Sequence, residues 1–392
     1  MNKSTSFPLI ALILVLSLSS QAFTSSPIST QPTLNNVLVC APGFFTELPA
    51  ECTNPSPYTD VTSDAYGISL VYDQAHGLAY TAPDPQLNVI DARYYLVNDT
   101  GTAFYPSIDA AREKKGAVQV INPGELIYVI YTERIDTEKG TFFLLPNGLY
   151  MPGDGSTVTV QTPFPGIEIK NIPIAPFGFV FTQTQVYAAP SEIYYNRPVR
   201  EIGPGVSDYP VVDIWATMNI KGETWHMIGI NEWVNGRSVA VVTPKTSAPE
   251  GVTDGSWIDV DLAEQSLAVY ENNKLIYATV MASGAEPLFT KPGLFQVFDK
   301  KESETMNGER NTPNFYHLEN VPWTMYFDKA RALHGAYWRA RLGFPQSHGC
   351  VNLYPGDAHW LFNWAKVGTW VNVYDTTGKT PTDPEFYGDG GA

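Results

Sequence analysis

A thiol and two imidazoles lie close together near the C-terminal end of the chain. The segment 347–352 reads Ser-His-Gly-Cys-Val-Asn, and a further histidine, His334, precedes it. A cysteine is a nucleophile only as its thiolate, and the free thiol titrates near ~8.5, so a reactive cysteine needs a base or a positive field beside it. Imidazole supplies such a base at neutral pH. Gly349 leaves the sulfur unobstructed and permits a tight turn. An isolated cysteine is most often a buried structural residue, but these neighbours favour Cys350 as a nucleophile.

Other segments accompany this motif in the order found in a known family. The segments 334–338 (His-Gly-Ala-Tyr-Trp) and 347–353 resemble the two-part signature of the L,D-transpeptidases, whose catalytic domain is called YkuD-like. Upstream, 257–262 (Trp-Ile-Asp-Val-Asp-Leu) resembles an opening strand of that family. The segment 290–295 (Thr-Lys-Pro-Gly-Leu-Phe) resembles its Thr-Pro-x-Gly turn, with the proline one place later. The resemblance covers residues 255–375.

The resemblance implies a role for each residue of the motif. Cys350 is then the nucleophile and His334 the general base, while the backbone carbonyl of Gly335 orients the imidazole. By sequence alone His348 is a rival base, because alternate residues of a strand share a face. The resemblance assigns it instead to support of the site. It also places the oxyanion hole at backbone N–H groups around His348, Gly349 and Cys350.

Four further residues are predicted to bind substrate or to brace this loop: Ser347, Asn352, Trp338 and Tyr326. Asn352 stands where many family members carry arginine, which leaves the chemistry intact and the subclass open. Tyr326 belongs to an aromatic run, 323–327, that is expected to flank the donor groove or to fill the core. His317 is a weaker candidate for the cleft. The other histidines have no partners at ligand spacing, so we predict no metal site and no cofactor.

The family's activity then implies the reaction. Cys350 would attack the bond between the third residue of a peptidoglycan tetrapeptide stem and its terminal D-alanine. D-alanine would leave, and the side-chain amine of a neighbouring stem would resolve the thioacyl enzyme into a 3→3 cross-link. Carbapenem-type β-lactams are expected to acylate the same thiol. Two alternatives stay open, an L,D-carboxypeptidase in which water is the acceptor and a wall-binding protein without turnover.

Composition and the N-terminal segment set the location. The net charge of −16 disfavours nucleic acid and anionic membrane faces as partners. Residues 1–22 carry a short basic start, an apolar run and a small-x-small cleavage site, which predicts a cleaved signal peptide and an exported protein of the cell wall, periplasm or medium. No membrane span is expected in the mature chain. Cys40 and Cys52 are free to pair in an oxidising compartment, which leaves Cys350 as a thiol.

The chain is expected to be mainly β and to contain several domains. Its 392 residues exceed one ordinary domain, and 31 glycines and 31 prolines fit many short strands joined by turns. The predicted parts are a signal peptide 1–22, a Pro-rich segment 23–61, a divergent SH3-like module 62–160, a second SH3-like module 178–245, a linker 246–255, a β-sandwich catalytic domain with a short helix 256–375, and a disordered tail 376–392.

The SH3-like prediction comes from two similar strand-turn-strand patterns, at 139–153 and 221–236. The second contains paired tryptophans, Trp225 and Trp233, and ends in a Trp-Val-x-Gly sequence. Such modules often hold wall glycans or peptides, although tryptophans at alternating strand positions more often fill a core. Within the catalytic segment, 271–274 (Glu-Asn-Asn-Lys) predicts a hairpin turn with asparagines at positive φ. A helix is predicted from Pro355, with Asp357 as its N-cap.

Overall fold

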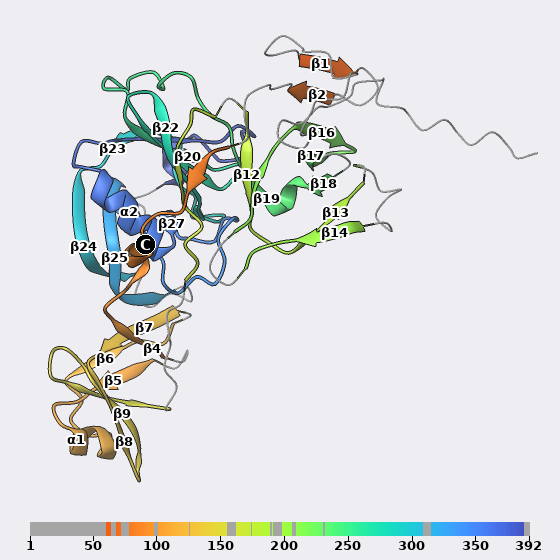
Figure 1. The fold of residues 1–392 in the computed structure, drawn as a ribbon. Helices are drawn as coiled ribbons and strands as arrows, with labels where there is room; N and C mark the ends of the chain where they lie inside the picture. The colour runs from red at the N-terminus through yellow and green to blue at the C-terminus, as the bar shows by residue number, and fades with distance from the viewer. Residues whose placement is uncertain are drawn as a thin grey trace, which may run out of the picture. The chain divides into compact units, whose positions relative to one another are not determined.

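The computed structural model describes residues 60–63, 68–71, 78–97, 101–124, 126–154, 162–173, 175–188, 190, 198–205, 209–229, 232–308 and 315–387. The predicted signal segment 1–22 and both Cys40 and Cys52 lie outside these residues. The described part of the chain is mainly β-strand with two α-helices (Figure 1).

The first sheet of the predicted catalytic segment combines a local antiparallel meander with strands from distant parts of the chain. Its strand order is β23-β28-β20-β21-β22-β11-β3. Five of these strands come from the catalytic segment, namely β20 (Trp257–Asp261), β21 (Ser266–Glu271), β22 (Lys274–Val280), β23 (Gly293–Gln296) and β28 (Trp370–Tyr374). The turn between β21 and β22 has Asn272 at φ 53 and Asn273 at φ 60. The asparagine turn is therefore confirmed, since a short polar side chain tolerates this backbone region.

A second sheet carries the cysteine-histidine motif. Its order is β27-β26-β25-β7-β4, with β24 paired to β25. The strands are β24 (Asp299–Asn307), β25 (Tyr316–Asp328), β26 (Arg331–Gly335), β27 (Val351–Leu353), β7 (Leu126–Tyr131) and β4 (Arg93–Val97). β25 pairs antiparallel with β26, and β26 pairs parallel with β27.

One apolar core joins the two sheets and the helix α2 (Pro355–Trp364). The first sheet contributes Ile258 and Val260, the second contributes Leu333 and Val351, and α2 contributes Leu361, all fully buried. A two-layer arrangement of this kind buries one face of each sheet. The predicted mainly β fold with a short helix is confirmed.

Asp357 does not cap α2. The N-cap residue is Tyr354, which makes no side-chain capping bond, and Asp357 lies inside the first turn. Its carboxylate is fully buried and accepts a hydrogen bond of 2.7 Å from the Tyr277 hydroxyl. The helix end is therefore tied to β22, a contact that no local sequence pattern specifies. Burial raises the pKa of Asp357 to about 7.

Segments upstream of residue 255 extend both sheets. β11 (Ile167–Ile169) pairs with β22 and with β3 (Tyr80–Thr81). β7 pairs in parallel with β25, and β4 pairs antiparallel with β7. The chain before the predicted catalytic domain thus contributes strands to its two layers.

The remaining strands form three smaller groups and one larger sheet. The smaller groups are β5 (Thr102–Phe104) with β6 (Gln119–Ile121); β8 (Glu133–Thr137), β9 (Gly140–Leu144) and β10 (Tyr150–Gly153); and β12 (Phe177–Val180), β15 (Val211–Asp213) and β19 (Val239–Val242). The larger sheet contains β1 (Asp60–Ser63), β2 (Ile68–Val71), β13 (Thr184–Tyr187), β14 (Pro198–Ile202), β16 (Ala216–Ile220), β17 (Glu223–Gly229) and β18 (Glu232–Asn235). The helix α1 (Ile108–Glu113) and the 3-10 turns η1 (Pro85–Asn88) and η3 (Gly236–Ser238) connect strands.

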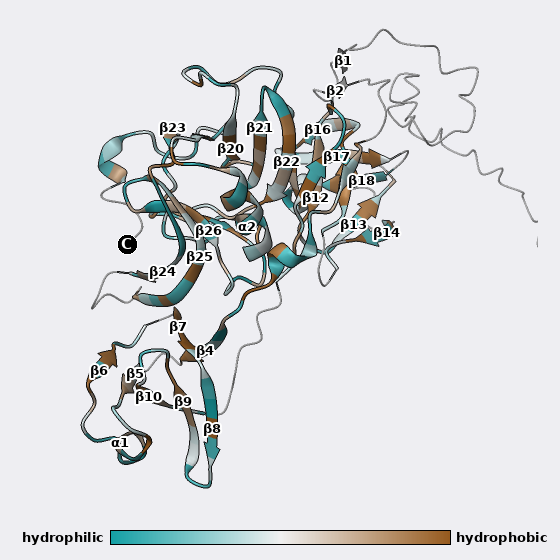
Figure 2. Cartoon of the chain, turned by 60° about the vertical axis from the view of Figure 1, so that its left-hand side comes forward, coloured by the Kyte–Doolittle hydropathy of each residue, from teal (hydrophilic) through white to brown (hydrophobic). Residues whose placement is uncertain are grey.

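Both predicted strand-turn-strand patterns form antiparallel pairs, β9 with β10 and β17 with β18. Figure 2 shows β8 in hydrophilic colours and β9 in hydrophobic ones, in line with the exposure of β8 and the burial of Phe142 and Phe143. Trp225 and Trp233 are buried. The SH3-like assignment of these regions stays a prediction.

The C-terminal segment differs in part from the disordered tail that its composition predicts. The 3-10 turn η4 (Pro384–Phe386) is followed by Tyr387, which is 4% exposed. Arg331 donates to the Tyr387 carbonyl at 2.5 Å, and its guanidinium lies 5.1 Å from the ring centroid. One aromatic side chain and a buried arginine thus hold residues that glycine and proline content alone would leave loose.

Candidate active site

Strand register brings the motif histidine and cysteine to one face of the second sheet. β26 and β27 pair in parallel, with Leu333 opposite Val351 and His334 opposite Asn352. Partners across a parallel pair point to the same side, and alternate residues along a strand share a face. Cys350 lies two places before Asn352, so it shares the face of His334. Leu333 and Val351 point the other way, into the core.

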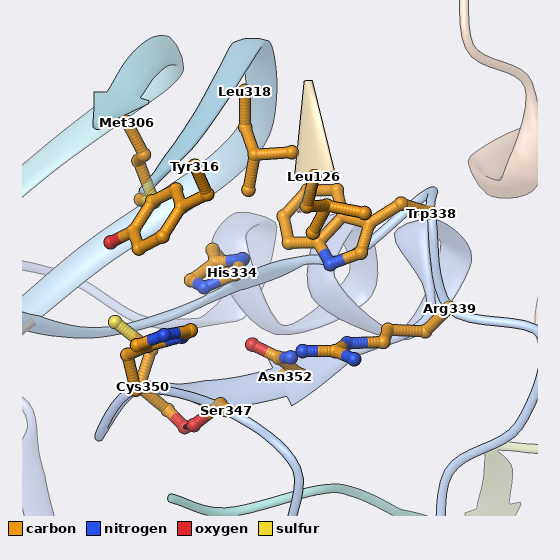
Figure 3. Close-up of a pocket in the computed structure, with 11 residues that line it drawn as sticks. Leu126, Met306, Tyr316, Leu318, His334, Trp338, Arg339, Ser347, Cys350 and Asn352 are labelled. Atoms are coloured by element: carbon orange, nitrogen blue, oxygen red, sulfur yellow. Dashed lines mark hydrogen bonds between the residues drawn. The ribbon is translucent and has the colours of Figure 1, made fainter. Parts of the chain in front are cut away.

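A single pocket collects most of the residues that the sequence predicts. Figure 3 shows the His334 ring between the Cys350 sulfur and the Trp338 ring. The lining residues are Leu126, Met306, Tyr316, Leu318, His334, Trp338, Arg339, Ser347, His348, Cys350 and Asn352. Six of these are predicted site residues, and the other five, which the sequence did not single out, are Leu126, Met306, Tyr316, Leu318 and Arg339.

His334 is buried and neutral at ordinary pH. Burial lowers the pKa of its imidazole to about 4, and the nearby Arg339 charge acts in the same direction. Its Nδ1 lies 3.3 Å from the Gly335 carbonyl oxygen, so the proton of a neutral ring belongs on Nδ1. Nε2 is then left as the basic nitrogen. The Trp338 ring stacks at 5.7 Å between centroids and holds the imidazole plane.

Cys350 is 8% exposed, and its thiol is protonated in the resting site. Burial raises the pKa of the thiol to about 11, although a backbone hydrogen bond at Ala332 and the charge of Arg331 act against the rise. Sγ lies 3.8 Å from the Ala330 carbonyl oxygen. Cys350 and His334 therefore form a pair of uncharged groups.

Ser347 closes the loop that carries the thiol. Its hydroxyl donates to the Cys350 carbonyl at 2.6 Å and accepts from the Gly349 N–H at 3.1 Å. Gly349 has φ +114, a backbone region that glycine alone adopts readily, and a Cβ there would lie 3.2 Å from Arg331 Nε. A glycine is therefore required by the backbone conformation of the turn, and it also leaves the sulfur accessible to a substrate.

Thr290 holds the site together, although the sequence analysis assigned it no role. Its hydroxyl donates to the Gly349 carbonyl at 2.9 Å and accepts from the Gly284 N–H at 2.8 Å. Thr290 is 1% exposed. It therefore joins the loop that carries Cys350 to the segment between β22 and β23. The signal available in the sequence was its place at the start of the 290–295 turn.

His348 packs against an aromatic residue from β25. Its ring lies 5.0 Å from the Tyr316 ring, and both line the pocket. The sequence analysis did not predict Tyr316 as a site residue and named its neighbour His317 instead. His317 instead bonds Asn307 and Glu319 and does not line the pocket.

Three predicted residues, Tyr326, Gly335 and Gly349, lie outside the pocket lining. Tyr326 is half-buried, and its hydroxyl donates to Glu304 at 2.6 Å. Gly335 contributes its backbone carbonyl to His334 and is itself fully covered. Leu126 was missed because it belongs to β7, far upstream in the sequence, and only the β7–β25 pairing brings it to the site.

Comparison with known proteins identifies a family for the C-terminal part of the chain. Residues 255–373 match the family model described as the L,D-transpeptidase catalytic domain, YkuD. The L,D-transpeptidase 2 of Mycobacterium tuberculosis (strain CDC 1551 / Oshkosh) is 28% identical over 131 residues, which are 31% of this chain and 32% of that protein. The chain thus spans about a third of the length of the curated relative that it matches.

Two solved structures are similar over about a third of the chain. The L,D-transpeptidase (Yku) from Stackebrandtia nassauensis is 27% identical, with a TM-score of 0.27, over 34% of this chain and 60% of that one. A mutant L,D-transpeptidase of Enterococcus faecium is 28% identical, with a TM-score of 0.30, over 34% of this chain and 55% of that one. The family assignment rests on the sequence match. The chain contains a YkuD L,D-transpeptidase catalytic domain, which extends over residues 255–373.

Proposed function

We propose that the chain is an exported, cysteine-dependent L,D-transpeptidase that forms 3→3 peptidoglycan cross-links, with Cys350 as nucleophile and His334 as base. One observation supports this most directly. His334 lies on β26, Cys350 directly precedes β27, the parallel neighbour of β26, and both side chains line the same pocket of the segment that matches the YkuD family model. Peptidoglycan stem peptides are then both donor and acceptor.

The uncharged pair defines the first step. As Sγ of Cys350 attacks the carbonyl carbon of the third stem residue, its proton passes to Nε2 of His334, and the carbonyl becomes an oxyanion. Collapse of the tetrahedral species breaks the peptide bond. The imidazolium gives its proton to the leaving amine of D-alanine, and a thioacyl enzyme remains.

The second step runs through the same groups. The acceptor amine attacks the thioester, His334 takes the amine proton, and the thiol leaves with that proton. The Gly335 carbonyl stabilises the imidazolium in both steps through Nδ1, the role that an Asp has in Ser-His-Asp triads.

The oxyanion needs N–H donors beside the thiol. The Gly349 N–H already donates to Ser347 Oγ. We therefore assign Gly349 and Ser347 to the shape of the loop, and the oxyanion site to the other backbone N–H groups of residues 348–350. His348 and Asn352 face the pocket and are assigned to substrate contacts.

Carbapenem-type β-lactams should acylate Cys350, because their strained carbonyl meets the same nucleophile. The predicted location is the wall, the periplasm or the medium. No helix in the described part of the chain has the length and apolar character that a membrane crossing requires.

The test is intact-protein mass spectrometry of the mature chain with a carbapenem and, separately, with a disaccharide-tetrapeptide. Wild type, Cys350→Ala and His334→Ala are compared. We expect an adduct only on chains that retain Cys350, and free D-alanine together with a cross-linked dimer in the peptide reaction. D-alanine without dimer would indicate a carboxypeptidase. Neither adduct nor turnover in the wild type would overturn the enzymatic function and leave wall binding.

A further inference from the structure

A guanidinium without a carboxylate partner lies in the wall of the active-site pocket. Arg339 lines the pocket, and its Nη2 donates to the Gln346 carbonyl oxygen at 2.6 Å. Its Nε is buried and has no hydrogen-bond partner, and no carboxylate of the described residues forms an ion pair with it. A buried charged donor without an acceptor is energetically costly, so a ligand that supplies an acceptor there would be bound favourably.

A second unpaired donor belongs to the preceding residue. The Nε1 of Trp338 is also buried, without a partner among the described residues, and also lines the pocket. Its ring is held between His334, stacked at 5.7 Å, and the edge of Tyr337 at 4.8 Å. Figure 3 shows this nitrogen and the Arg339 guanidinium facing the same part of the pocket, beside Asn352.

The two donors suit one kind of ligand. Both are N–H groups, one is charged, and neither accepts, so the complementary group is an oxygen acceptor with negative charge. Guanidinium binds carboxylates with directional, charge-assisted hydrogen bonds. Burial lowers the pKa of the Arg339 guanidinium below its ordinary value, but an arginine remains protonated at working pH.

We propose that Arg339 Nε and Trp338 Nε1 form a subsite that binds a carboxylate of the donor peptide beside the thiol. The proposal rests on the proposed function, because it assumes a peptide donor. Arg339 lies in the loop between β26 and β27, and it lines the pocket together with Asn352.

The test is isothermal titration of the full mature chain carrying Cys350→Ala, so that binding is measured without turnover. The ligand is an N-acetylated L-Ala-D-isoGlu-diaminopimelate-D-Ala tetrapeptide. Three further ligands each replace one carboxylate, at the isoglutamate, at the diamino acid or at the terminal alanine, with a carboxamide. These arms identify which carboxylate is bound.

We expect one carboxamide ligand to bind at least tenfold more weakly than the parent. Adding Arg339→Gln should weaken the parent at least tenfold and abolish the difference between these two ligands, as expected for two groups that interact directly. The matched control is Arg341→Gln, which removes the same charge from an exposed position of the same loop and should leave the difference intact.

Arg339 also braces the loop through the Gln346 carbonyl, and a bracing role alone predicts another pattern. If Arg339→Gln weakens the binding of all four ligands equally, the proposed subsite is wrong. The proposal is also wrong if the Cys350→Ala chain binds all four ligands with equal affinity, or binds none of them. If Arg339→Gln does not fold, Arg339→Lys replaces it. Lys keeps the charge and lacks Nε, and it should weaken the parent threefold or more while the preference for carboxylate persists; an unchanged affinity would contradict the proposal.

A separate assay tests the proposed function independently of the subsite. Wild-type chain is incubated with the parent tetrapeptide and D-alanine is measured. A carboxylate preference in binding without D-alanine release would overturn the transpeptidase function and keep the subsite.

Discussion

The thiol of Cys350 and the imidazole of His334 are both uncharged at rest. The pKa of the thiol is raised to about 11 and that of the imidazole is lowered to about 4, both chiefly by burial. A group that is buried without a counter-charge favours its neutral form. In the proposed mechanism we therefore expect the thiolate to form only during attack, by proton transfer to His334, and not to be stored as a thiolate–imidazolium pair.

If the thiol is uncharged at rest, the rate at which iodoacetamide alkylates Cys350 should depend strongly on pH. Because the pKa is raised, the thiolate fraction should grow about tenfold per pH unit between pH 7 and 10. The rate is measured by intact mass, with Cys350→Ala as the control for labelling elsewhere. A rate that is already constant below pH 8 would show a stored ion pair and contradict the uncharged state.

The two motif histidines should differ in their effect on turnover. His334→Ala removes the base and should lower kcat/KM for D-alanine release by ~10²–10⁴-fold. His348→Ala removes a ring that packs on Tyr316 and should cause a smaller loss. Both variants are compared at pH 7 and 9. A larger loss for His348→Ala would assign the base to that residue.

At the scale of elements, the nucleophile depends on a loop held from two sides. Ser347 closes it internally, and Thr290 ties it to the segment that follows β22. Strand pairing alone leaves the 348–350 turn undefined, since β27 begins only at Val351. These two hydroxyls therefore fix where Sγ lies relative to β26.

Thr290→Val tests this connection. Valine has nearly the same shape but leaves the Gly284 N–H and the Gly349 carbonyl unpaired in a buried place, which costs about 1–3 kcal/mol per group. We expect a lower Tm and slower acylation of Cys350 by a carbapenem. Thr290→Ser keeps the hydroxyl and should retain most of both. Wild-type acylation in Thr290→Val would show that the loop is held by other contacts.

At the scale of the whole chain, the catalytic layers reach beyond the family match. The β4–β7 pair lies on the edge of β25, and Ile130 N–H bonds the Glu319 carboxylate at 2.9 Å. Tyr94 of β4 stacks on Tyr337 at 3.8 Å. Since Tyr337 supports Trp338, the upstream strands also support the pocket.

Tyr94→Ala should therefore destabilise the catalytic layers although residue 94 lies far outside the matched segment. Tyr94 is fully buried, and truncation of a buried aromatic side chain costs about 3–5 kcal/mol. Thermal unfolding should show a lower Tm, and the KM for the donor should rise. Tyr80→Ala, at a 44% exposed position of β3, is the control. An unchanged Tm for Tyr94→Ala would contradict a structural role for this layer.

The sequence by itself determined the features that depend on near neighbours. Alternation along 257–262 fixed a buried strand, two asparagines fixed a hairpin turn, and Ser-His-Gly-Cys with His334 marked the reactive groups. Each follows from side-chain chemistry within a few residues, which holds before the chain folds.

Only the tertiary structure decided the features that join distant segments. Leu126 enters the pocket by the pairing of β7 with β25, and Asp357 binds Tyr277 instead of capping its helix. Arg339 becomes a cation in the pocket wall whose Nε has no hydrogen-bond partner among the described residues only when its surroundings are assembled. Burial and the absence of a partner are properties of packing across the fold, so no local pattern in the sequence contains them.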